Sequence, residues 1–529
     1  MSCAKKSFLH AARSARVHAL ASSIAVTAGV SNETQLFGRE VLLEAVRVLA
    51  LIIRNAIGCL LCAWIANLCF SQGNIFSSRP SRTQSTASLV VASLVWTNVM
   101  YAAIVLLTQA AVLAPMRFVV RPDGPAGFVF CLKRLARASF HYYLASLALT
   151  IGFGALLANV TPPGLRWLKL EFYVGNWVNH GYTAAILYLT RQVYRAETRK
   201  GQERQQLEPL RSRGGGLWRS YLNTAPQALS SVLAGMYVHV ASQSRIYDDA
   251  LAVLLFAGAS FGVKIVVQEL VKVYVMRRGV RQIRLMCMLL GVPTVLIDTQ
   301  VRVMLLLGKQ SSHFNALGSV TMAAVELGMR VGKMVLLLHQ VQRRKRAIEE
   351  TDAELSSSRC SSENSSQNDR ESVRDETATS LTTFERWRKQ MADFHTAEVM
   401  ADMYAEYIAI GCSASILYFF CDHPKYIYVS TSDVVAASNT TEAPSSTSSG
   451  SSSSTSSSSS SVNALLRTQF QLVGFQVLME IAVDYVCCVF EISMGARFRS
   501  VRRFGSFLGF VFMTVAVVNI AISSLLFLK

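Results

Sequence analysis

Long apolar stretches alternate with short polar segments along most of this chain. Eleven stretches approach the roughly 20 mainly apolar residues that a membrane-spanning helix needs. They cover residues 48–70, 87–114, 140–160, 172–190, 226–242, 250–270, 285–308, 314–338, 402–421, 468–492 and 505–528. The second and the last contain no charged residue, and 226–242 is the shortest. The pattern predicts an all-α, multi-pass transmembrane helical bundle of about 11 spans.

The composition supports this prediction. Hydrophobic residues make up 51% of the 529 residues and charged residues only 16%, whereas soluble globular proteins carry about 25% charged residues. This balance excludes an ordinary soluble enzyme and a wholly disordered chain. The net charge of +19 does not indicate a nucleic-acid partner, because the basic residues are spread over the segments between the spans.

The distribution of Lys and Arg predicts the orientation. If the N-terminus lies inside, the inside segments hold 38 basic residues and the outside loops hold 8. Cytoplasmic loops carry the excess of Lys and Arg, so we predict the N-terminus inside and the C-terminus outside. The inside loops would then contact anionic lipids of the inner leaflet. We expect the plasma membrane, with an endomembrane or organelle as the alternative.

Three segments of the chain lie outside the predicted spans and divide it into parts. Residues 1–47 form a basic tail, although 1–32 also fit a transit or signal peptide. Residues 48–338 hold the first eight spans. A cytoplasmic disordered loop with phosphorylatable serines is expected at 339–401. After the ninth span at 402–421, an extracellular Ser-rich loop at 422–467 carries a glycosylation sequon at Asn439, and residues 468–528 hold the last two spans.

Ionisable residues fall inside several predicted spans, where they are costly and normally face the bundle interior. Glu398, Asp402 and Glu406 share one face of the ninth helix, and Glu480 and Asp484 share one face of the tenth. The eighth span supplies opposite charge at a similar depth. We therefore predict an ion or solute path formed by these carboxylates and their partners, namely Glu406, Glu480, Asp484, Arg330, Lys333 and Glu326.

Three interpretations of this cluster remain open at the level of sequence. It could be a salt-bridge network that orders the helices, a path for protons, ions or a charged solute, or a carboxylate metal site. The third would use His395 and Glu398, whose spacing is related to bundle di-metal motifs. Because these two residues lie at the predicted membrane edge, the sequence favours no metal and no cofactor.

Further polar residues mark a secondary cavity. Asn176 and His180 share a face of the fourth span, and Asp298 and Arg302 follow the helix-kinking Pro293 in the seventh. In the sixth span, Gly258 and Gly262 have the spacing of close helix–helix contacts in membranes, so we expect another helix to pack there.

Motifs for soluble chemistry are absent from the sequence. It contains no nucleotide-binding loop, no dinucleotide fingerprint, no His-Glu-x-x-His and no nucleophile elbow. We therefore expect neither an enzyme nor a pump that hydrolyses ATP itself.

Three short segments carry a resemblance to a known family. Residues 398–407 read EVMADMYAEY, and after the Ser-rich loop come MEIAVDY at 479–485 and EISMG at 491–495. Together they resemble polytopic membrane proteins expanded in oomycetes. The resemblance covers about 100 residues of the C-terminal part. It implies a helical membrane protein and carries no activity with it.

Two functions from different classes are compatible with the sequence. The first is a transporter or channel-like protein that moves an ion or small solute without its own ATPase. The alternative is a non-transporting surface or signalling protein that acts through its outer Ser-rich loop and its inner phosphorylatable loop. Neutralising the carboxylates distinguishes them, because only the first requires those charges.

Overall fold

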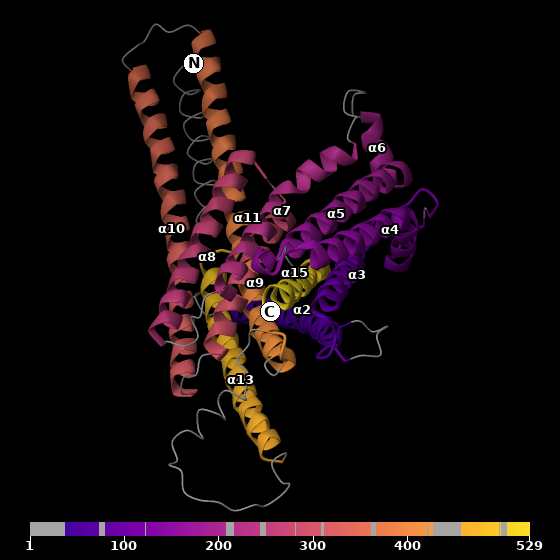
Figure 1. Ribbon diagram of the computed structural model, residues 1–529. Coiled ribbons are helices and arrows are strands. Elements are labelled where there is room, and N and C mark those ends of the chain that lie inside the picture. The colour runs from indigo at the N-terminus through magenta and orange to yellow at the C-terminus, as the bar shows by residue number, and fades with distance from the viewer. Residues whose placement is uncertain are drawn as a thin grey trace, which may run out of the picture.

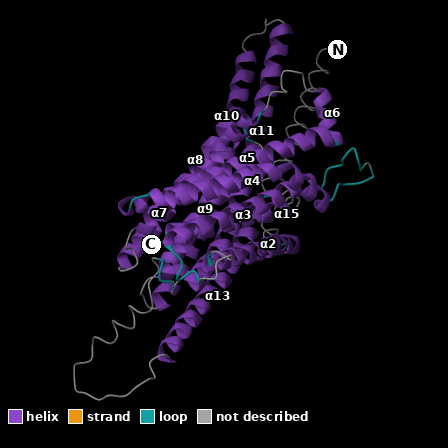
Figure 2. Cartoon of the chain, turned by 45° about the vertical axis from the view of Figure 1, so that its right-hand side comes forward, coloured by secondary structure: helices purple, strands orange, loops and turns teal. Residues whose placement is uncertain are grey.

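The computed structural model describes residues 38–73, 80–121, 123–207, 216–243, 250–280, 282–307, 312–360, 367–420, 423–426, 456–496, 498 and 505–528. In this part of the chain the regular structure is helical, apart from isolated β-bridges (Figure 2). The all-α prediction is therefore confirmed. The helices are α2 (Arg39–Gln72), α3 (Thr86–Leu113), α4 (Phe128–Val160), the 3₁₀ helix η1 (Pro163–Leu168), α5 (Leu170–Glu197), α6 (Arg199–Leu207), α7 (Leu217–Gln243), α8 (Ala250–Arg278), α9 (Ile283–Leu307), α10 (Ser312–Cys360), α11 (Gln367–Phe420), α13 (Ser456–Ser493) and α15 (Gly505–Leu526).

Each of the eleven predicted spans overlaps a different one of these helices. Eight helices in the described residues are long and apolar enough to cross a membrane, namely α2, α3, α4, α8, α9, α11, α13 and α15. The other three predicted spans lie in α5, α7 and α10, which carry more polar or charged residues. The chain is thus a multi-pass helical membrane protein, while the count of eleven spans and the orientation of the termini stay predictions.

The surface of the bundle carries large apolar side chains, as expected for a protein in contact with lipid. α4 and α8 expose large apolar side chains along much of their length, including Leu144, Leu149, Leu255 and Val266. Exposing apolar surface of this extent to water is unfavourable, whereas exposing it to the hydrocarbon of a bilayer is not. The buried interior, by contrast, contains many charged residues. Apolar side chains on the surface together with charged side chains in the interior support embedding in a membrane.

α9 lies at the centre of the bundle, and every residue of its most apolar stretch is buried. α11 and α15 pack against α9, and α2 packs against α11 and α15. α2, α11 and α15 run in the same direction as one another. Asn55 of α2 meets Tyr404 of α11, and Asn67 meets Ser415 further along both helices. Figure 1 shows α3, α4 and α5 as a separate group on one side of this centre. α8, α10 and α13 cover the opposite side.

Close packing depends on glycines other than the pair expected from sequence. A Cβ at Gly411 of α11 would lie only 2.0 Å from the Leu60 side chain of α2. Nothing lies within 4 Å of a Cβ built at Gly258 or Gly262. The prediction of close packing at these two glycines is therefore wrong, because their face of α8 is not covered by another described helix.

α10 and α11 extend beyond the bundle as a pair of long helices (Figure 1). The structure differs here from the disordered loop expected at 339–401, because residues 339–360 and 367–401 are helical. The start of this segment is rich in Gln, Arg, Lys, Ala and Glu, which favour helices. Lys345 and Glu349 pair one turn apart, and the Arg344 guanidinium lies 4.4 Å from the Trp387 ring centre across the pair. We call the end of the bundle from which they project the hairpin end.

Candidate functional site

Ionisable side chains from five helices, most of them buried, form neighbouring groups within the bundle. α8, α9, α10, α11 and α13 all contribute, and within each group the members are joined by ion pairs, by a bridging glutamine or by close approach. Together we call these groups the charge ladder. Its members are Lys264, Asp298, Arg302, Glu326, Arg330, Lys333, Glu398, Asp402, Glu406, Glu480, Asp484 and Glu491.

Towards the hairpin end, Arg330 of α10 contacts two carboxylates of α13. Its Nη1 donates to Asp484 Oδ1 at 2.5 Å, and its Nε lies 3.4 Å from Glu491 Oε1. Arg330, Asp484 and Glu491 are all buried. A planar guanidinium with five donors suits such double pairing. α10 and α13 are thereby joined by charge within the apolar bundle.

A second set of contacts in the ladder connects α8 with α9, α10 and α11. Lys264 Nζ donates to Asp298 Oδ2 at 2.9 Å and lies 3.6 Å from Asp402 Oδ1. Gln268, one turn later on α8, donates to Asp402 and accepts from Lys333. Lys333 also donates to Glu398 Oε1 at 2.8 Å. The neutral amide of Gln268 therefore links two ion pairs into one network.

The far end of the ladder, away from the hairpin end, begins with Arg302 of α9. Its Nη2 donates to Glu480 Oε1 of α13 at 2.5 Å, while its Nε is buried without a described partner. From Glu480 to Glu491 the ladder follows eleven residues of α13, which is about 16 Å at roughly 1.5 Å per residue. This covers about half of a hydrocarbon core of roughly 30 Å.

Three carboxylates converge next to Arg302. Glu326, Glu406 and Glu480 each offer an oxygen, and these oxygens all lie within 4.8 Å of one another. We call them the carboxylate trio. Glu406 is 1% exposed, and neither of its oxygens has a hydrogen-bond partner among the described residues. Oε1 of Glu326 and Oε2 of Glu480 are buried and unpartnered in the same sense.

The ladder contains more acidic than basic groups. Four basic side chains, from Lys264, Arg302, Arg330 and Lys333, face eight carboxylates. Buried carboxylates require compensation by pairing, a proton or a cation, because desolvation of an unpaired charge is costly. The described basic groups cannot neutralise them all. The arrangement can therefore accept additional positive charge.

The structure brings together all six residues predicted for the path, but the partners differ in part. Arg330 pairs with Asp484, whereas Lys333 pairs with Glu398 and not with the predicted carboxylates. Glu406 has no ion pair among the described residues. His395 and Glu398, the alternative metal pair, do not form a metal-type group here, since the grouping that could hold an ion is the trio.

The secondary candidates separate into two sets. Asp298 and Arg302 belong to the ladder. Asn176 and His180 lie on α5 and face α7, where Ser231 donates to Asn176 and the His180 ring lies 5.4 Å from that of Tyr221. No described ion pair links either of them to the ladder.

Sequence reasoning missed Gln268. Its charged neighbour Glu269 is exposed and pairs with Lys272 on the same helix. Gln268 is buried and lies one turn from Lys264 on the same face of α8. This spacing of four residues from a charged residue within a span is the feature of the sequence that indicates Gln268. A second predicted site, the sequon at Asn439, lies outside the described residues.

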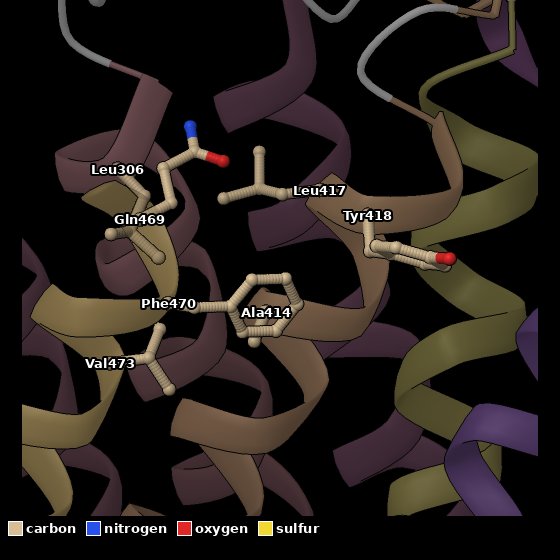
Figure 3. Close-up of a pocket in the computed structure, with 7 residues that line it drawn as sticks. All are labelled: Leu306, Ala414, Leu417, Tyr418, Gln469, Phe470 and Val473. Carbon is tan, nitrogen blue, oxygen red and sulfur yellow. The ribbon is translucent and has the colours of Figure 1, made fainter. Parts of the chain in front are cut away.

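A small, mainly apolar pocket lies beyond the far end of the ladder (Figure 3). Leu306 follows Arg302 by one turn on α9, and Val473 precedes Glu480 by two turns on α13. Apolar side chains thus separate the ladder from this end of the bundle. The pocket is lined by Leu306, Ala414, Leu417, Tyr418, Gln469, Phe470 and Val473.

Lys169 is a buried base outside the candidate spans. It lies between η1 and α5, and its Nζ donates to the backbone carbonyl of Leu528 at 2.5 Å. Burial lowers the pKa of Lys169 below the ordinary value for a lysine. This contact ties the end of the described chain to the start of α5, away from the ladder.

No family model, curated protein or solved structure matches this chain. The resemblance of residues 398–495 to oomycete membrane proteins therefore stays a prediction.

Proposed function

We propose that this protein is a membrane transporter or channel-like protein for an ion or small solute and that it does not hydrolyse ATP itself. One observation carries the proposal: an interior ladder of charged groups in which eight carboxylates face four bases. Intramembrane ionisable residues in such arrangements mark ion and proton pathways.

Helix packing alone does not account for the ladder. Replacing buried ion pairs by apolar residues is often neutral or stabilising, because desolvation offsets much of the attraction. A purely structural network would also balance its charges. Glu406 adds a buried negative charge without adding a contact to a described partner. Transient binding of a cation or a proton to Glu406 would explain why this carboxylate is buried there.

The layout also suggests how the path is closed. The charged groups extend from Glu491 to Arg302, and apolar residues such as Leu306 and Phe470 follow. A hydrophobic constriction can stop ions by excluding water until the helices move. We propose that the hairpin end faces the cytoplasm, in agreement with the distribution of basic residues, and that the apolar end faces outward.

Ion flux in vesicles tests the proposal. Purified protein would be reconstituted, and uptake of H⁺, Na⁺, K⁺, Ca²⁺ and Mn²⁺ would be recorded under a pH gradient without ATP. We expect flux of at least one ion, and its loss in Asp484→Asn at unchanged folded yield. Glu269→Gln provides the matched control, because this carboxylate is exposed on α8. Absence of wild-type flux for every ion and solute tested would contradict the proposal.

A signalling role is the second candidate, and the long α10–α11 pair favours it. These helices project beyond the bundle and offer a surface for a soluble partner (Figure 1). In this case α10 and α11 would transmit movements of the ladder, to which Arg330, Lys333 and Glu398 belong, towards the hairpin end.

Shortening the helical pair separates the two candidates. Deletion of 345–388 with a short flexible linker leaves the ladder residues intact. Under the transport proposal the shortened protein keeps its flux. Under the signalling alternative its cellular output is lost, while Asp484→Asn changes only stability.

A further inference from the structure

We propose that the carboxylate trio binds one divalent cation of the Mg²⁺, Mn²⁺ or Ca²⁺ class through oxygen ligands. This inference rests on the proposed function for the role of the cation, which would be the transported ion or its coupling ion. The binding itself can be measured without transport.

The geometry of Glu326, Glu406 and Glu480 suits a single ion. Mg²⁺ and Ca²⁺ take oxygen ligands at about 2.0–2.6 Å, so ligands on opposite sides of one ion lie about 4–5 Å apart. The three oxygens of the trio lie within 4.8 Å of one another. They come from α10, α11 and α13, so one ion could bridge three helices that are far apart in the sequence.

An independent observation points to a ligand. Both oxygens of Glu406 lack a hydrogen-bond partner among the described residues, although the side chain is buried to 1% exposure. Buried carboxylate oxygens are normally hydrogen-bonded. Oε1 of Glu326 and Oε2 of Glu480 are also buried without a hydrogen-bond partner among the described residues. Four acceptor atoms therefore remain for an ion and its water ligands.

The local charge favours a divalent ion. Arg302 compensates Glu480, whereas Glu326 and Glu406 have no ion pair among the described residues. When Glu326 and Glu406 are ionised, two negative charges remain in the trio. One divalent cation would neutralise both.

The donor set favours hard cations. All three ligands are carboxylates, which suit Mg²⁺, Ca²⁺ and Mn²⁺, whereas thiolate and imidazole ligands favour softer metals such as Zn²⁺. No described His or Cys belongs to this group. We therefore expect Mn²⁺ to bind at the trio.

The test is Mn²⁺ binding to the full-length protein in detergent after treatment with a chelator. Calorimetry gives affinity and stoichiometry, and the loss of the hexaaqua Mn²⁺ signal in electron paramagnetic resonance reports direct ligation. We expect one strong site, displaced by Ca²⁺ or Mg²⁺. Glu406→Gln and, separately, Glu326→Gln should each weaken binding about 10-fold or more, while Glu269→Gln should bind as the wild type does.

Two variants keep the test decisive, because Glu326→Gln reports on the site if Glu406→Gln fails to fold. The cation site is contradicted if the wild type binds no Mn²⁺, or if both variants bind as tightly as the wild type. Flux that requires Glu406 without any metal binding would also overturn the site and leave protons as the ion, with the proposed function intact. Specific binding without any flux would support the site and remove the transport function.

Discussion

Two regions of this molecule hold their helices together by different chemistry. In the α3–α5 region, Asn98 donates to both Ser146 and Asn179, and Thr183 donates to Tyr101. These contacts are neutral. In the α8–α13 region the connecting groups are ionisable, and acids outnumber bases. The neutral region demonstrates that helices of this chain can be joined without buried charge.

The charge ladder therefore needs an explanation beyond the assembly of the helices. Neutral interhelical hydrogen bonds contribute roughly 0.6–2 kcal/mol each in membranes and leave no charge to compensate. The ladder confers stability only where each charge has a partner. Glu406 and the other groups that lack a described partner do not stabilise the helix packing in this way. They therefore favour a binding site over a purely structural network.

The largest expected effect is the loss of Arg330. Arg330→Met removes the partner of Asp484 and Glu491, so we expect a loss of about 3–5 kcal/mol in the free energy of unfolding. Thermal unfolding in detergent micelles measures it. Arg134→Met is the matched control, since the Arg134–Glu197 pair is exposed and should contribute about 0–1 kcal/mol. Equal losses in the two variants would remove the distinction between the ladder and a surface pair.

The contact between the two helices α2 and α11 gives the next effect. Gly411→Ala places a methyl group against Leu60, and overpacking of this kind costs about 1–3 kcal/mol. Gly258→Ala meets open space on α8, so it should be neutral or slightly stabilising, because alanine favours helix more than glycine does. Melting temperatures of the two variants compare them directly. A larger loss in Gly258→Ala would indicate that another surface covers α8.

The neutral region should respond more weakly than the ladder. Asn98→Ala removes the hydrogen bonds to Ser146 and Asn179, and we expect a loss of about 1 kcal/mol. Ion flux should remain. Thermal unfolding and vesicle uptake on the same preparation check both points. Loss of flux at unchanged stability would place part of the path in the α3–α5 region. It would contradict the claim that only the ladder carries the transported ion.

The smallest effect concerns Lys169. Its pKa is lowered by burial, so protonated Lys169 weakens the folded state relative to the unfolded one. Stability should therefore rise as the pH rises from the lowered pKa towards the ordinary value of about 10.4. Lys169→Met should flatten this rise. Melting temperatures between about pH 8 and about pH 10 measure it, and an unchanged slope in the variant would assign the rise to other groups.

The helices could be predicted from sequence because the bilayer imposes a length and an apolar composition on each span. The carboxylate faces of α11 and α13 followed from spacing alone. The partners did not. Arg302 meets Glu480 and Lys333 meets Glu398 because of how five helices pack, and helix periodicity contains no information on that packing.

Two other differences have physical causes. Gln268 was missed because a neutral side chain is not costly enough in a span to draw attention, although it links two ion pairs. The polarity of residues 339–360 predicts a disordered loop, whereas the structure has a helix there. Their helix-forming residues and the contact of Arg344 with Trp387 allow a helix outside the apolar bundle.

Glu406→Gln, measured for stability and flux in one preparation, tests the central claim most directly. The substitution keeps the shape of a buried side chain and removes a charge that has no described partner. The account predicts that the melting temperature stays the same or rises while cation flux is lost. Flux equal to that of the wild type would contradict it and assign the ladder to assembly of the helices.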